Sequence, residues 1–144
     1  MSTPESWKPH GGGFELWKIQ LGELDERMGV EIVEESAEKV VARMPVAGNR
    51  QSLGLLHGGA MVAIAEAVGS WAALIHASTL GKVVVGVDIN ATHHRSTKEG
   101  WVTATATALH LGRRMCSHEV VLRNEQGQRL CTARISNAVI EPKT

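Results

Sequence analysis

One long apolar stretch of the chain predicts a central helix. It begins at about His57 and continues to His76, and between these two histidines only Glu66 has a side chain that ionises. A helix with one face in water would show polar residues at every third or fourth position. This stretch offers only Ser70 besides Glu66. We therefore expect most of the helix surface to be buried.

Strand patterns lie on both sides of this helix. Residues 102–108 alternate between threonine and alanine, which places the two residue types on opposite faces of a strand. Residues 30–35 and 39–44 are typical of a hairpin, and a short helical piece is expected near residues 16–28. Four long strands are expected after the central helix, over residues 82–92, 100–111, 115–124 and 129–140.

This order of elements predicts an α+β fold. Strands before and after one apolar helix favour an antiparallel sheet with the helix packed on one face. A chain of 144 residues is long enough for one such domain. We assign residues 28–144 to the domain and residues 1–27 to an N-terminal extension with a short helix.

Composition narrows the classes of partner. Fifteen basic and fifteen acidic residues cancel, so no overall charge attracts nucleic acid or an anionic membrane. Glu66 interrupts the only candidate for a transmembrane segment, and the polar residues 1–10 lack the apolar core of a signal peptide. We expect a cytoplasmic protein.

The two cysteines are not expected to form a disulfide. Cys116 and Cys131 fall on adjacent predicted strands joined by a turn at residues 124–127. Pairing around that turn leaves them about four positions out of register, which at about 3.3 Å per residue is too far for an S–S bond.

Candidate chemistry centres on the helix. A carboxylate that is buried without a partner costs several kcal/mol, so Glu66 predicts a compensating environment or a reacting partner. The helix opens with Gly58 and Gly59. Glycine lets a ligand approach the backbone closely, and the free amides of a first helical turn can stabilise a developing oxyanion.

These residues carry a family resemblance. His57 to Ala60, followed by Glu66 and Ser70, resembles the central helix of the hotdog-fold acyl-CoA thioesterases, and residues 84–96 and 109–113 follow in the same order and spacing. The resemblance covers about residues 28–140. It is strongest to the branch of the phenylacetate-pathway and 4-hydroxybenzoyl-CoA thioesterases. Within that branch it is strongest to the enzymes that hydrolyse 1,4-dihydroxy-2-naphthoyl-CoA and to their siderophore-pathway proofreading relatives.

The resemblance implies a role for each catalytic position. The Gly58 amide would be the oxyanion donor, while Gln51 and His57 would orient or polarise the thioester carbonyl. Glu66 would attack that carbonyl or act as general base on water, and the sequence does not choose between these roles. Ser70, four residues further along the same helical face, could hold the water or the carboxylate.

Spacing along the helix separates two of these groups. Gly58 and Glu66 are eight residues apart, or about 12 Å along a helix axis, so both cannot reach one carbonyl. If both act, one comes from another subunit. This predicts a symmetric homodimer with shared sites, and the family implies a dimer of dimers, a homotetramer.

Two clusters of histidine and arginine are candidates for a metal-binding site or an anion-binding site. Neighbouring strand residues point to opposite faces, so His93 and His94 cannot both chelate one ion, and no metal site is expected. Arginine forks suit the phosphates of coenzyme A. By position, the resemblance implies that the acyl and coenzyme A channel is lined by Gly86, His93, His94, Arg95, Ser96, His110, Leu111, Gly112, Arg113, Arg114 and Met115.

Together these points predict an acyl-CoA thioesterase that acts on an aromatic or bulky acyl-CoA. The leading candidate substrate is 1,4-dihydroxy-2-naphthoyl-CoA, an intermediate of menaquinone biosynthesis, and no metal or redox cofactor is expected beyond the coenzyme A of the substrate. A non-catalytic acyl-CoA-binding regulator is the main alternative, although it would need no Glu66. A hotdog hydratase or dehydratase would usually carry a histidine and an acid near the helix start, and this helix has no aspartate.

Overall fold

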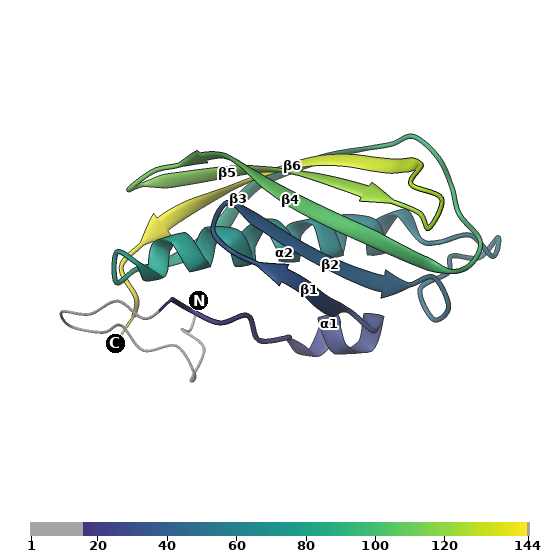
Figure 1. The fold of residues 1–144 in the computed structure, drawn as a ribbon, viewed down its shortest axis with the longest axis horizontal. Coiled ribbons are helices and arrows are strands. Elements are labelled where there is room, and N and C mark those ends of the chain that lie inside the picture. Colours follow the sequence, from purple (N-terminus) through teal and green to yellow (C-terminus); the bar gives the residue numbers. More distant parts are fainter. Residues whose placement is uncertain (1–15, 144) are drawn as a thin grey trace.

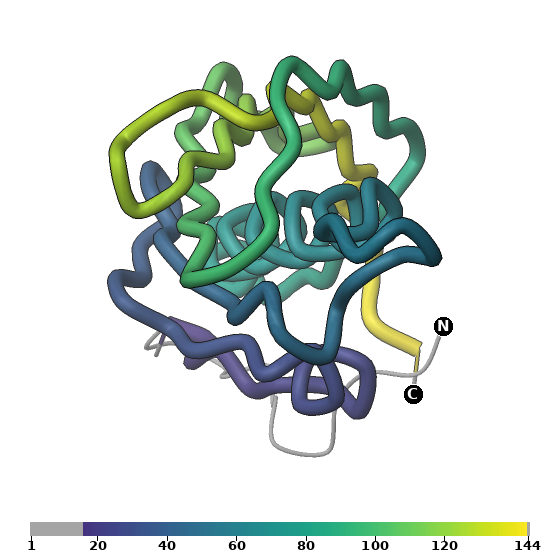
Figure 2. Tube along the Cα trace, turned by 90° about the vertical axis from the view of Figure 1, so that its right-hand side faces the viewer, coloured from purple at the N-terminus to yellow at the C-terminus, as the bar shows by residue number. Residues whose placement is uncertain are grey.

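A computed structural model describes residues 16–143. One long helix, α2 (Gly58–Ser78), lies along a six-stranded antiparallel sheet in the order β1-β2-β4-β5-β6-β3 (Figure 1). The other elements are α1 (Glu23–Met28), β1 (Glu31–Glu35), β2 (Lys39–Pro45), β3 (Val83–His93), β4 (Trp101–Leu111), β5 (Met115–Arg123) and β6 (Arg129–Ile140). The sheet curves over the helix on one side, and residues 16–28 cross on the other (Figure 2). The predicted α+β arrangement is confirmed.

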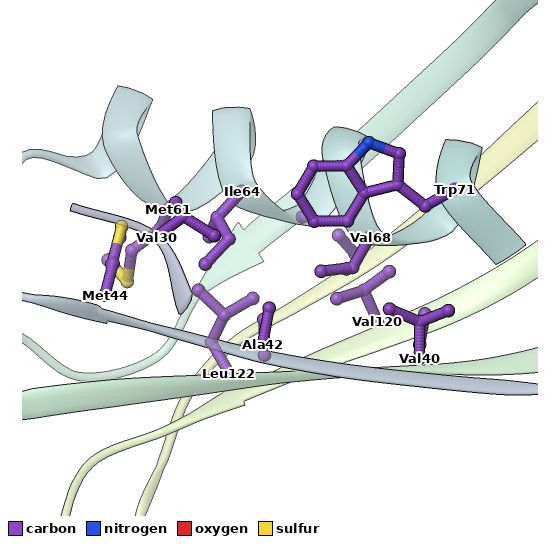
Figure 3. Close-up of a cluster of buried hydrophobic side chains, with 14 of the residues drawn as sticks. Val30, Val40, Ala42, Met44, Met61, Ile64, Val68, Trp71, Val120 and Leu122 are labelled. Carbon is purple, nitrogen blue, oxygen red and sulfur yellow. The ribbon is translucent and has the colours of Figure 1, made fainter. Parts of the chain in front are cut away.

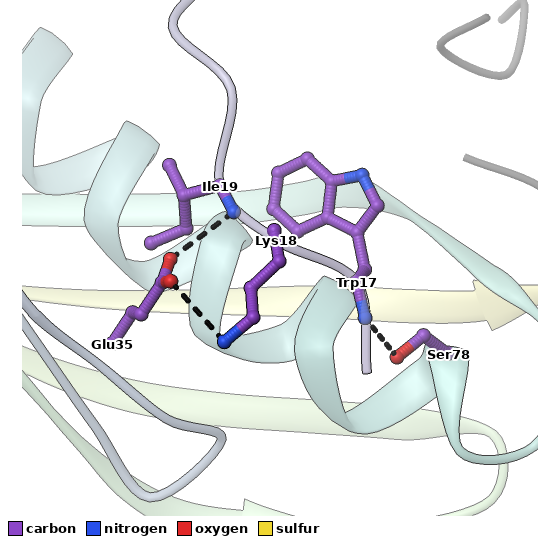
Figure 4. Close-up of polar contacts among 5 residues, drawn as sticks. All are labelled: Trp17, Lys18, Ile19, Glu35 and Ser78. Atoms are coloured by element: carbon purple, nitrogen blue, oxygen red, sulfur yellow. Dashed lines mark hydrogen bonds and ion pairs between the residues drawn. The ribbon is translucent and has the colours of Figure 1, made fainter. Parts of the chain in front are cut away.

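The N-terminal helical prediction is wrong in extent. Only α1 is helical, and residues 16–22 run extended along the domain. Their backbone amides bond to side chains of the domain instead of forming helical bonds: Trp17 donates to Ser78 Oγ (3.0 Å) and Ile19 donates to the Glu35 carboxylate (3.1 Å) (Figure 4). These tertiary contacts replace the local pattern that predicted a longer helix.

Helix α2 packs on the sheet through an apolar face. Buried side chains such as Ile64, Val68 and Trp71 meet Val120 and Leu122 of the sheet (Figure 3). By length and mean hydropathy (1.5) α2 would qualify as a membrane span, and half of that window is buried inside the fold. Its apolar composition is that of a core helix.

One glycine lets the helix approach the sheet. A Cβ added at Gly69 would lie 2.2 Å from Ile135 Cγ2, so any side chain there would push α2 away from β6. Because apolar contacts lose much of their attraction when a gap opens, this close approach supports the core on which the functional groups of α2 depend.

Strand β3 is an edge of the sheet and therefore has one unpaired side. The register of its pairing with β6 shifts between Gly86 and Asp88, and the Val87 side chain is 60% exposed. An exposed edge strand that also carries apolar side chains can pair with another chain.

Both cysteines are free, as the predicted strand register implied, and both are buried. Cys131 pairs with Leu122 of β5, whereas Cys116 pairs with Asn137. The offset is six residues along β6, larger than the four expected, and the two thiols stay apart.

Candidate active site

The N-terminus of α2 forms the first part of the site. His57 is the N-cap, and its Nδ1 accepts a hydrogen bond from the Gly59 amide (2.8 Å). Among residues 16–143, no acceptor takes the neighbouring Gly58 N–H. The His93 ring covers Gly58 so closely that an added Cβ would lie 3.0 Å from Nε2. Glycine at this position therefore makes room for the His93 ring beside a free backbone amide.

A cleft of about 300 Å³ opens at this helix end, between the loop before α2 and the end of β3. It brings together six of the predicted site residues. Its lining is Gln51, Leu55, Leu56, Gly58, Met61, His93, His94, Arg95 and Ser96. Six residues that were predicted for the site therefore line one cleft.

Gln51 is held in place by its own loop. Its side-chain Oε1 accepts hydrogen bonds from the Leu53 amide and, at 3.4 Å, from the Leu55 amide. A glutamine side chain also has two N–H donors, so these bonds hold the carbonyl end and leave the amide nitrogen able to donate.

The two neighbouring histidines both line the cleft but make different contacts, and His94 lies just beyond the end of β3. His93 lies against Gly58, while His94 Nε2 is 2.9 Å from Thr132 Oγ1 on β6. Across residues 16–143 no three His, Cys, Asp or Glu side chains come together as a metal site.

Glu66 lies apart from the cleft, toward the other end of β3. Its Oε1 is placed over Gly86, where an added Cβ would be 3.1 Å away. The expectation of a buried carboxylate is wrong for a single chain, because Glu66 is exposed. Its neighbours on α2, Val62, Ala63 and Ala67, are half-buried.

Asn137 of β6 adds a residue that the sequence analysis missed. It is fully buried, and its Nδ2 donates to Ser70 Oγ at 3.0 Å. Its Oδ1 has no hydrogen-bond partner among the described residues. The signal was an amide at an inward strand position between the buried Ile135 and Val139.

The predicted segment His110–Met115 comprises the end of β4, the turn at residues 112–114 and the first residue of β5. The Gly112 carbonyl lies 2.8 Å from His76 Nε2 at the C-terminal end of α2. Across the sheet, this turn is level with Gly86, because Leu111 pairs with Cys116, Cys116 with Asn137, and Asn137 with Gly86. One chain therefore holds two separate groups, one at each end of β3.

Comparison with known proteins finds thioesterases both as the matching family and among similar sequences. The family model described as thioesterase superfamily matches residues 53–131. A protein named proofreading thioesterase EntH, from Cronobacter turicensis, is 41% identical over 93% of this chain and 98% of its own length.

Solved structures that resemble this chain include thioesterases as well. Thioesterase HI1161 from Haemophilus influenzae superposes with a TM-score of 0.77 at 36% identity, covering 88% of this chain and 96% of that one. A variant of thioesterase SAV0944 from Staphylococcus aureus, with a glutamine replaced by alanine, gives 0.78 at 30% identity over 82% and 98%. A second variant of SAV0944, with a glutamate replaced by alanine, gives 0.75 at 31% identity over the same shares.

Proposed function

The chain belongs to the thioesterase superfamily and is a thioester hydrolase, and we propose that it cleaves an aromatic or similarly bulky acyl-CoA to the free acid and coenzyme A. The leading candidate substrate is 1,4-dihydroxy-2-naphthoyl-CoA, which would place the enzyme in menaquinone biosynthesis. The reaction needs no metal or redox cofactor. The observation that carries the proposal is the free Gly58 amide in a cleft beside Gln51 and His93.

The cleft at the start of α2 suits a thioester carbonyl. The Gly58 N–H stands at a helix N-terminus, where backbone partial charge favours an anion. Donors that are already in position as the carbonyl oxygen becomes negative lower the barrier, typically by about 3 kcal/mol for one donor. The Gln51 side-chain amide and His57 would orient the same carbonyl.

Glu66 would supply the reacting carboxylate, by one of two routes. As a general base it takes a proton from water, the water oxygen bonds to the carbonyl carbon, and the C–S bond breaks with the proton passing to the thiolate. As a nucleophile its carboxylate bonds to the carbonyl carbon, expels the thiolate and leaves a mixed anhydride that water hydrolyses. Both routes need the carboxylate within reach of the Gly58 cleft.

Two copies of the chain would satisfy that need. Antiparallel pairing of β3 with β3 of a second copy, about the middle of the strand, would bring the Gly86 end of one chain beside the His93 end of the other. Glu66 would then face the cleft at Gly58 of the partner. The free edge of β3, the exposed Val87 and the apolar flank beside Glu66 all support this homodimer, which would associate further into a dimer of dimers.

The same pairing would join the two coenzyme A segments. Arg95 lines the cleft at one end of β3, while Arg113 and Arg114 lie exposed in the turn at the other end. In a two-fold dimer the turn of one chain would approach the cleft of the next. Arginine binds phosphate through charge-assisted hydrogen bonds, so these side chains would hold the nucleotide end of the substrate.

The solved SAV0944 variants support the choice of Gln51 and Glu66. The glutamine and the glutamate that those variants replace lie fifteen positions apart in that protein. Gln51 and Glu66 have the same separation in this chain.

Thiol release from a panel of aryl, long-chain and short-chain acyl-CoAs tests the proposal. We expect the aryl thioesters, 1,4-dihydroxy-2-naphthoyl-CoA first, to give the highest kcat/KM. Glu66→Gln should lower kcat at least about a hundredfold while the fold is retained, because the amide fills the same space but neither attacks nor accepts a proton. Glu38→Gln, a change at an exposed glutamate of the β1–β2 hairpin, is the matched control and should leave kcat unchanged. Near-normal turnover by Glu66→Gln would overturn the catalytic assignment.

A further inference from the structure

A buried amide lies directly behind the proposed catalytic carboxylate. Asn137 is on β6, opposite Gly86 of β3 in the strand register. A Cβ added at Gly86 would lie 3.1 Å from Glu66 Oε1 and 4.0 Å from Asn137 Nδ2. The carboxylate and the amide therefore border the same small space, which exists because residue 86 has no side chain.

Ser70 is bonded to the amide and lies one helical turn from the carboxylate. Its hydroxyl accepts the hydrogen bond from Asn137 Nδ2 at 3.0 Å. A hydroxyl has one proton and two lone pairs, so occupation of one lone pair by the amide turns the proton toward another acceptor. Glu66, four residues earlier on the same face of α2, is within side-chain reach of Ser70, and an ionised carboxylate only accepts.

We propose that Asn137 is a positioning residue for the hydrolysis: it orients the Ser70 hydroxyl so that this hydroxyl donates to the Glu66 carboxylate and fixes its position. The proposal rests on the role proposed above for Glu66. Because Asn137 is fully buried and bonded to Ser70, it would act through Ser70 and not on the substrate itself.

The burial of Asn137 points the same way. Its neighbours on the inward face of β6 are Ile135 and Val139, both buried. The Asn137 side chain is fully buried and its Oδ1 is without a partner among the described residues. An unsatisfied buried polar atom destabilises a fold, so an apolar side chain would serve packing better. A residue that breaks a local packing rule without a structural gain is typical of a functional position.

A double-mutant cycle on kcat tests this role. Asn137→Val removes the donor and keeps a branched side chain suited to a strand, and Ser70→Ala removes the hydroxyl that Asn137 holds. Loss of one hydrogen bond to a charged group predicts a fall in kcat of about tenfold for each variant, with KM little changed. Because both changes break the same path, the double variant should be no slower than the slower single variant.

Two further variants serve as controls for this experiment. Asn137→Ala removes the same donor and leaves a smaller side chain. If Asn137→Val does not fold, Asn137→Ala takes its place and should show the same fall in kcat. Ser136→Ala removes one partner of another hydroxyl pair between β5 and β6, Ser117 Oγ to Ser136 Oγ at 2.9 Å. It has no path to Glu66, so its kcat should equal that of the wild-type enzyme.

Normal kcat in a folded Asn137 variant, or losses that multiply in the double variant, would overturn the positioning role alone. A change confined to KM would overturn it as well. Absence of hydrolysis by the wild-type enzyme, or full activity of Glu66→Gln, would instead overturn the proposed function together with this role.

Discussion

Replacing Gly86 with alanine should slow turnover without weakening the fold. The backbone at Gly86 does not have a positive φ, so alanine is compatible with its conformation. Alanine in place of such a glycine reduces the entropy of the unfolded chain and stabilises by about 0.4 to 1 kcal/mol. The nearest atom to the added Cβ is Glu66 Oε1, at 3.1 Å.

The size of the effect follows from that contact. A carbon and an oxygen in ordinary contact are separated by about 3.4 Å or more, so the carboxylate must retreat by at least a few tenths of an ångström. A misplacement of about 1 Å can cost about a hundredfold in rate. Scaling between these limits predicts a loss of roughly fourfold to a hundredfold, and the loss should fall mainly on kcat because the added methyl displaces the carboxylate.

The measurement pairs steady-state thiol release with urea unfolding of Gly86→Ala. A second background provides the control: Glu66→Asp shortens the carboxylate by one methylene, so the added methyl of Gly86→Ala should cost little further activity there. An unchanged kcat in Gly86→Ala would show that the carboxylate does not work from its position over Gly86. A fall in the free energy of unfolding would show that the glycine serves the fold instead.

Two more predictions address binding and pH. Arg95→Ala and Arg113→Ala should each raise KM for full coenzyme A thioesters by roughly tenfold while barely affecting thioesters truncated at pantetheine, because the arginines would contact the remote phosphates; equal effects on both substrates would contradict this. Burial lowers the pKa of His118 from its usual 6.5, so the unfolded chain takes up a proton below that pH that the folded chain does not. The free energy of unfolding should therefore fall as the pH drops from 7 to 5, by up to about 1.4 kcal/mol per pH unit, and His118→Gln should flatten this slope in urea titrations at several pH values.

The strands and the central helix were predictable because their patterns are local. Alternation at residues 102–108 and the apolar run from His57 arise from the periods of strand and helix, and tertiary contacts did not override them. Residues 16–22 were mispredicted because side chains distant in sequence, Ser78 and Glu35, satisfy their backbone.

The site was predictable only in part, and for a physical reason. A family resemblance supplied Gln51, Gly58 and Glu66, and helix geometry separated Gly58 from Glu66. Asn137 was missed because its proposed role depends on the strand register that places it opposite Gly86 and on a contact with Ser70 from another element. The alternation of residues along one strand reveals neither this register nor this contact.

Mixing two inactive variants tests the shared site most directly. Each site is proposed to take Glu66 from one chain and His57 with Gly58 from its partner. Glu66→Gln and His57→Ala, dissociated and reassociated together, should then form heterodimers with one intact site and one doubly defective site. With free exchange half of the dimers are hetero, so activity should recover to roughly a quarter of the wild-type value if the sites act independently. Complete inactivity of verified heterodimers would mean that Glu66 and His57 serve one site from the same chain, and would contradict the shared site.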